Sequence, residues 1–180
     1  FEAAERDHHG RKLGLPALRA DDASRVAALQ ALLQEGEVDM TLFFRQLADV
    51  DAQAPSLEPL QSAFYDDARR QRIEPALRDW LEWLAARWRD SDAEANVDAG
   101  NAAVQRRARM QATNPRYVPR NYLAQQAIDR AEVGDTGGIA ELLEVMRQPY
   151  VDQPGREAFA ERRPDWARTR VGCSMLSCSS

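Results

Sequence analysis

The sequence predicts an all-α protein, and two observations lead to that prediction. Apolar residues recur every three or four positions over most of the 180 residues, which is the spacing of one helix face. No segment shows the strict alternation of apolar and polar residues that is typical of a strand, and no repeat of fixed period is present. Glycine and proline divide the chain into helices of ordinary length.

The first well-marked helix is expected between an aspartate N-cap, Asp21 or Asp22, and a glycine stop at Gly36. A second helix begins at Asp39, which again suits the N-cap position. Two prolines then indicate a loop, and a short helix is expected over about residues 60–68.

The strongest helical pattern covers residues 74–90, where Pro75 suits the first turn because a helix needs no N–H there. A stripe of this kind is typical of a face buried in the core, although it would also suit burial against another domain. The stripe consists of Leu77, Trp80, Leu81, Trp83, Leu84 and Trp88.

A polar, alanine-rich helix is expected over residues 98–112, and two prolines follow it. The next helix opens near Arg120 and ends at Gly134, and another begins at Asp135. Because so few residues connect these two helices, we expect them to form an antiparallel pair. The apolar stripe of the second helix consists of Ile139, Leu142, Leu143 and Met146.

From Pro149 onward, repeated prolines predict an irregular tail, packed by Tyr150, Phe159 and Trp166. We therefore divide the chain into a helical region, residues 1–148, and a C-terminal tail, residues 149–180. The first residues show no initiator methionine and no clearly capped element, so we expect the chain to be a fragment.

Composition excludes several classes of partner. A net charge of −5 argues against nucleic-acid binding, which needs a basic face. No apolar run approaches the roughly 20 residues that span a bilayer, so no membrane partner is expected. Lys12 is the only lysine beside many arginines and alanines, which indicates a GC-rich bacterial genome.

No residue pattern predicts a catalytic, cofactor-binding or metal site in this segment. His8 and His9 are the only histidines, and adjacent side chains on a helix point apart, so one metal ion would not readily use both. The paired aspartates fall at helix ends or on polar faces, where capping and solvation explain them. The arginines Arg106, Arg107 and Arg109 are expected on a surface face, neutralised by acidic neighbours.

The stretch from Asn114 to Ile128 carries the most polar detail, and it allows two interpretations. In the first, which spacing favours, it is simply a helix N-terminus with Asn121 near the cap and Arg120 paired to an acid. In the second, Arg120, Asn121 and Gln125 form a polar hub that docks on a partner domain.

Both cysteines, Cys173 and Cys178, lie in the small-residue tail, where an exposed thiol is expected. Their spacing is a poor zinc signal without further ligands, and a thiol oxidoreductase would need a βαβ setting that is missing. The two thiols are redox candidates. They could pair with each other, or either could pair with a cysteine outside this segment.

Six segments in this order resemble the C-terminal part of the selenoprotein O (SelO) family, in a bacterial member. Pro119 departs from the family pattern, which usually has an aliphatic residue there. The six segments are "RKLGL" (11–15), "DMTLFFRQL" (39–47), "NPRYVPRNYLAQQAIDRAEVGD" (114–135), "LLEVMRQPY" (142–150), "RRPDWA" (162–167) and "SCSS" (177–180).

The resemblance implies a protein-kinase-like fold, of which this chain supplies the end of the C-lobe and a helical extension. It implies a cytoplasmic enzyme that uses ATP and Mg2+ to transfer AMP to Ser, Thr or Tyr hydroxyls of proteins. The catalytic residues of the family lie upstream, so the partner expected for this segment is the missing N-terminal kinase-like region.

In the same resemblance, Cys178 occupies the position of selenocysteine in animal members, which implies a redox-responsive tail. The alternative function is a stand-alone helical interaction module, which would use the tryptophan stripe and "RNYLAQQ" as its contact surface.

Overall fold

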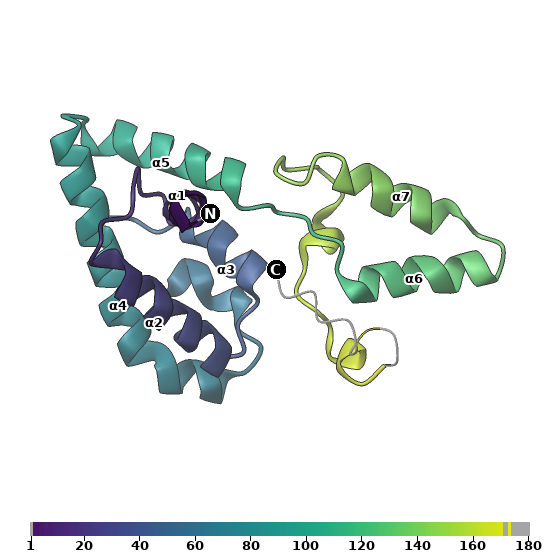
Figure 1. Cartoon of the computed structure of the whole chain (residues 1–180). Coiled ribbons are helices and arrows are strands. Elements are labelled where there is room, and N and C mark those ends of the chain that lie inside the picture. Colours follow the sequence, from purple (N-terminus) through teal and green to yellow (C-terminus); the bar gives the residue numbers. More distant parts are fainter. Residues whose placement is uncertain (1, 171–172, 174–180) are drawn as a thin grey trace. The chain divides into compact units, whose positions relative to one another are not determined.

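A computed structural model describes residues 2–170 and residue 173, and within that range the regular elements are helices (Figure 1). An isolated antiparallel bridge joins Val38 and Phe64. The all-α prediction is therefore confirmed for the described residues. The chain divides into two compact units, residues 1–114 and residues 115–180. The expected boundary after residue 148 stays a prediction.

Short polar side chains begin several helices of unit 1, as the sequence predicts for Asp39. The Asp39 carboxylate accepts a hydrogen bond from the backbone N–H of Leu42 at 3.1 Å, and Gly36 ends the preceding helix. The elements of unit 1 are α1 (Glu2–Lys12), α2 (Asp22–Glu35), α3 (Met40–Leu47), the 3-10 helix η1 (Glu58–Ala63), α4 (Asp67–Glu94) and α5 (Ala99–Thr113).

Helix α4 begins earlier than the sequence predicts. Asp66 caps it by accepting from the N–H of Arg69 at 2.8 Å, so Pro75 lies inside the helix rather than in its first turn. The missing proline N–H and its ring therefore disturb the backbone bond to Gln71, four residues before. Packing of the long apolar stripe on both sides of Pro75 outweighs that local loss.

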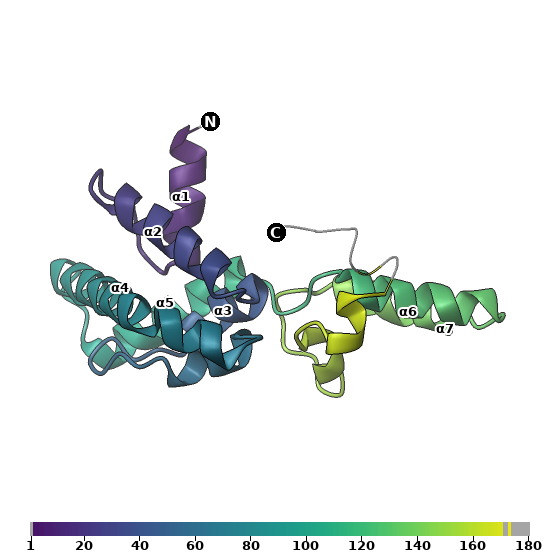
Figure 2. The same cartoon turned by 90° about the horizontal axis from the view of Figure 1, so that it is seen from below.

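The core of unit 1 forms where α2 runs antiparallel along α4, as Figure 1 and Figure 2 both show. Residues from the predicted stripes meet there and lose all or nearly all contact with water. Burial of one such side chain contributes about 1.5–3 kcal/mol. With the residues that α3 and η1 add, the largest of the buried side chains in this unit are Leu29, Leu33, Phe43, Leu47, Leu60, Ile73, Leu77, Trp80, Leu81, Leu84 and Trp88.

A left-handed glycine ends α1 and turns the chain so that both of its neighbours are buried. Gly14 has φ +72, and a Cβ built there would lie 2.6 Å from Sδ of Met110. Leu13 and Leu15 on either side are each 2% exposed. Only glycine allows this backbone at this close approach to α5.

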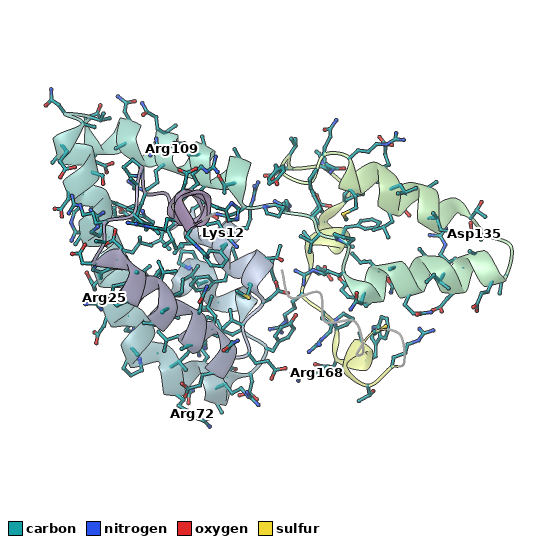
Figure 3. All side chains as sticks on the ribbon, in the orientation of Figure 1. Lys12, Arg25, Arg72, Arg109, Asp135 and Arg168 are labelled. Carbon is teal, nitrogen blue, oxygen red and sulfur yellow. The ribbon has the colours of Figure 1, made fainter. Side chains whose placement is uncertain are left out.

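Unit 2 contains the predicted antiparallel pair. Figure 3 shows Asp135 at the turn between the two helices, where its carboxylate accepts from the N–H of Gly137 at 2.9 Å. The elements are α6 (Asn121–Glu132), α7 (Gly137–Met146) and two 3-10 helices, η2 (Glu157–Ala160) and η3 (Asp165–Arg168).

The buried face of α7 differs from the predicted stripe. Val145 is fully buried, whereas Ile139 is 41% and Leu143 is 60% exposed. Leu142 and Met146 of the predicted stripe do pack against buried clusters, and Gly138 and Val145 are buried beside them in place of Ile139 and Leu143. In the tail, Tyr150 and Trp166 are also more exposed than expected, and Phe159 carries more of the packing. No helix among the described residues combines the length and the hydropathy needed to cross a membrane.

Candidate functional site

The first two turns of α6 and its N-cap hold the three residues that the sequence selects for docking. Arg120 takes an extended backbone conformation, with φ −61 and ψ 140, and its carbonyl accepts the N–H groups of Leu123 and Ala124. Arg120 is therefore the N-cap, one residue earlier than Asn121. The side chains of Arg120, Asn121 and Gln125 are half-buried within unit 2.

Cys173 lies close to this helix, and its environment contradicts the expectation of an exposed thiol. The residue is 4% exposed and packs in an apolar cluster with Tyr122, Leu123 and Ala167. Leu142 and Phe159 complete the cluster. Sequence reasoning missed this burial because the immediate neighbours of the cysteine are glycine and serine. The covering groups come from α6, α7, η2 and η3.

Three contacts hold the segment before Cys173 on α6. Arg170 forms an ion pair with Asp129, with Nη2 2.7 Å from Oδ2 and 2.8 Å from Oδ1. The ring of Trp166 meets Tyr122 edge to face, with centroids 6.2 Å apart. The hydroxyl of Tyr122 donates to the carbonyl of Glu161 at 3.1 Å. We call residues 161–170, together with Cys173, the docked segment.

Asp129 connects two residues that the sequence singled out separately. Gln125 donates to Oδ1 of Asp129 at 3.0 Å, and this hydrogen bond, followed by that from Arg170, lowers the pKa of the Asp129 carboxyl. The backbone N–H of Cys173 in turn donates to the carbonyl of Arg170 at 3.1 Å. The structure thus brings Gln125 and Cys173 into one contact chain, through two residues that no sequence pattern identified.

The loop after α7 is fastened by a buried tyrosine that sequence reasoning also missed. Tyr117 is 1% exposed, and its hydroxyl accepts from the N–H of Gln153 at 3.1 Å. The side-chain amide of Gln153 donates to the carbonyls of Val145 and Gln148, each at 3.0 Å. The carbonyl of Pro149 accepts the N–H groups of both Tyr117 and its preceding residue.

In unit 1, Trp80 and Trp88 of the stripe are internal, as the core interpretation predicts, and Trp83 is half-buried. Trp80 donates its ring N–H to the carbonyl of Arg25 at 2.9 Å, and Trp88 donates to that of Leu13 at 2.8 Å. The rings of Trp80 and Trp88 are buried, so they offer no contact surface for the interaction-module alternative.

Arg106 departs from the predicted surface position. It is 5% exposed, with its guanidinium 4.6 Å from the centroid of the Trp88 ring and 3.0 Å from a carboxylate oxygen of Asp92. Arg107 stays at the surface and pairs with Asp49 at 2.9 Å. The expectation of acidic neighbours is right for both arginines, but Arg106 belongs to the core.

The part of the chain that the structure describes contains no cluster of side chains suited to bind a metal ion. No three His, Cys, Asp or Glu side chains there are grouped to hold a metal ion. His8 and His9 lie on α1, with ring centroids 6.3 Å apart and the rings tilted by 60°. Cys178 falls outside the described residues.

Comparison with known proteins gives one family. A family model described as protein adenylyltransferase SelO matches residues 1–147. A protein nucleotidyltransferase YdiU from Xanthomonas axonopodis pv. citri is 53% identical over all 180 residues, and one from Aromatoleum aromaticum is 51% identical over the same length. A third, from Azoarcus sp. strain BH72, is 55% identical over 169 residues, or 94% of the chain. The chain spans about a third of these relatives, 33%, 33% and 31% of their lengths.

Proposed function

The chain belongs to the SelO family of protein adenylyltransferases, and from this membership we propose that it is the helical C-terminal part of such an enzyme. The parent protein transfers AMP from ATP to Ser, Thr or Tyr hydroxyls of protein substrates in the bacterial cytoplasm. This segment completes the C-lobe of a protein-kinase-like fold and extends it. The match over residues 1–147 is the observation on which the proposal rests.

Two features of the described residues support a structural role for this segment. Unit 1 uses its large aromatic side chains in its own core, and unit 2 uses α6 to hold its own docked segment. The ATP and Mg2+ of the proposed reaction would be held by the upstream part of the parent chain. The missing N-terminal region is therefore the proposed partner of this segment.

We also propose that the start of α6 contributes to the contact with that region. Arg120 and Asn121 lie at the N-terminus, where backbone N–H groups and polar side chains occur together, and Gln125 follows in the second turn. Gln125 already donates to Asp129, so its part in docking is to fix that carboxylate.

The tail has a proposed redox role, in which Cys178 forms a reversible disulfide. Burial of Cys173 in an apolar cluster favours a partner sulfur outside this segment, because a thiol that is 4% exposed reacts only when its cover opens. Cys173 then acts as a packing residue, and its pairing with Cys178 becomes the less favoured arrangement.

The proposed activity is tested by incubating labelled ATP and Mg2+ with either the full-length parent protein or this 180-residue segment. We expect AMP transfer by the parent, measured as a mass increase on protein substrates, and none by the segment. AMP transfer by the segment alone would overturn the structural role. A parent protein that transfers phosphate instead of AMP would overturn the proposed reaction.

Peptide mapping of the oxidised parent protein without reductant tests the tail. A disulfide that joins Cys178 to an upstream cysteine supports the proposal. A free Cys178 thiol after oxidation counts against any redox role, and a Cys173–Cys178 bridge would show that the buried cluster opens.

A further inference from the structure

Two hollows lie along α6 and share three lining residues, Leu123, Gln126 and Phe159. One hollow, of about 430 Å³, continues beside Leu142 of α7. The other, of about 320 Å³, continues beside Trp166 of the docked segment. We call the two together the α6 groove.

The groove offers an apolar floor and one unused amide. Leu123 and Phe159 form the shared floor, and among the described residues none forms a hydrogen bond with the Gln126 side chain. An amide has donors and an acceptor, so Gln126 is suited to bind the backbone of an extended peptide. The chemistry of the groove therefore fits a short peptide with bulky apolar side chains.

In the hollow beside α7 the charged residues are already paired, which lowers its attraction for a charged ligand. Asp129 pairs with Arg170, and Glu141 pairs with both Arg130 and Arg156. A peptide without charged side chains is consequently the best match.

The chain itself supplies such a peptide next to the groove. Cys173 packs on Leu123 and belongs to the same apolar cluster as Phe159, so the chain reaches the groove floor at this residue. Residues 174–180, "SMLSCSS", carry no charged side chain, and Met175 and Leu176 are their only large apolar residues. Two or three residues of extended chain reach about 7–10 Å from Cys173, and Leu123 of the same cluster lines both hollows.

We propose that the residues following Cys173 bind in the α6 groove, with Met175 and Leu176 on its apolar floor and Gln126 hydrogen-bonded to their backbone. The tether at Cys173 gives the peptide a millimolar effective concentration, so weak contacts suffice. This inference rests on the proposed redox role of the tail. Binding of Met175 and Leu176 would limit the positions that the thiol of Cys178, two residues further on, can reach.

The test measures how fast hydrogen peroxide oxidises Met175 in the full 180-residue chain, with mass spectrometry of the peptides as the readout. The chain carries Cys178→Ser, and no ATP is added, so the result is independent of both AMP transfer and disulfide formation. Gln126→Arg places a long charged side chain in the groove. Ile128→Arg is the matched control, since Ile128 is on α6, is 47% exposed and lines neither hollow.

We expect Gln126→Arg to speed oxidation of Met175 about fivefold, the factor for loss of about 1 kcal/mol of binding, and Ile128→Arg to leave it unchanged. Met146, half-buried in the same unit, reports on folding and should keep its rate. If Gln126→Arg changes the oxidation rate of Met146, the variant Leu176→Ser is used instead to test the proposal, because it alters only the bound peptide. If Met175 is oxidised at the same rate in the 180-residue chain with Leu176 and in the chain with Leu176→Ser, the proposal is overturned.

Discussion

Arg87 of α4 and Asp22 at the start of α2 meet through two parallel hydrogen bonds, Nε to Oδ1 and Nη2 to Oδ2, each 3.1 Å long. Both side chains are buried, with 9% and 2% of their surfaces exposed. The second oxygen also accepts from the backbone N–H of Arg19 at 2.8 Å. This pair holds the first turn of α2 against α4 in unit 1.

Replacing Asp22 by alanine should destabilise the chain by about 3–5 kcal/mol, because it leaves the Arg87 guanidinium buried without its counter-charge. Urea unfolding, followed by the fluorescence of Trp80 and Trp88, measures the change. Asp21→Ala is the control, since Asp21 is exposed and its side chain makes no cap bond, and it should cost less than about 0.5 kcal/mol. Equal losses in the two variants would contradict a specific role for the pair.

The same pair predicts a pH dependence. Burial by itself raises the pKa of Asp22, but the hydrogen bonds from Arg87 and Arg19 outweigh it and hold the pKa below its ordinary value. The contribution to stability is therefore complete above the unfolded pKa of about 3.9 and is lost as pH falls through the lower folded pKa.

The measurable quantity is the difference in unfolding free energy between the wild type and Asp22→Asn. We expect this difference to be constant between about pH 5 and pH 6 and to shrink below about pH 4. Other carboxylates titrate in both proteins and cancel in the difference. A difference that grows on acidification would contradict the assigned direction of the pKa shift.

Gly14→Ala should lower the free energy of unfolding more than most substitutions of a small residue. The left-handed backbone costs an L-residue about 1–2 kcal/mol, and crowding against Met110 and Arg106 adds about 1–3 kcal/mol. Gly134→Ala is a matched control, because Gly134 has φ +89 but no atom within 4 Å of the added Cβ. Denaturation followed by circular dichroism should show the larger loss for Gly14→Ala.

Pro75→Ala tests where α4 begins. Inside a helix, proline removes one backbone bond, so alanine at this exposed position should stabilise the chain by about 1–3 kcal/mol. Pro59→Ala, at the start of η1, should give no such gain. An unchanged stability for Pro75→Ala would instead favour a helix that starts at Pro75.

Cys173 should react slowly with iodoacetamide in the folded, reduced chain. Labelling requires the cluster of Tyr122, Leu123 and Ala167 to open, and an opening free energy of 1.4 kcal/mol already slows it about tenfold. Mass spectrometry of peptides from folded and urea-unfolded samples gives the ratio. Equal rates in the two samples would show that the thiol is accessible.

Local features were predictable because their chemistry involves neighbours in the chain. Asp39 caps α3 through a bond to a residue three positions away, and Gly36 ends α2 as its residue type favours. The antiparallel pair of α6 and α7 followed from a connection too short for any other arrangement.

The errors fall where a partner comes from elsewhere in the chain. Arg106 resembles a surface arginine by its neighbours, but Trp88 and Asp92 of α4 enclose it. Ile139 and Leu143 fit a helical stripe, yet Val145 is the buried residue, because Tyr117 and Ala160 pack on it.

The sequence by itself determined the helical class, most helix ends and the family resemblance, because periodicity and capping are properties of adjacent residues. Only the tertiary structure decided that Cys173 is buried and that Gln125, Asp129 and Arg170 link it to α6. Burial depends on which apolar surfaces meet in space, and residues 123 and 173 are brought together by packing rather than by any local pattern.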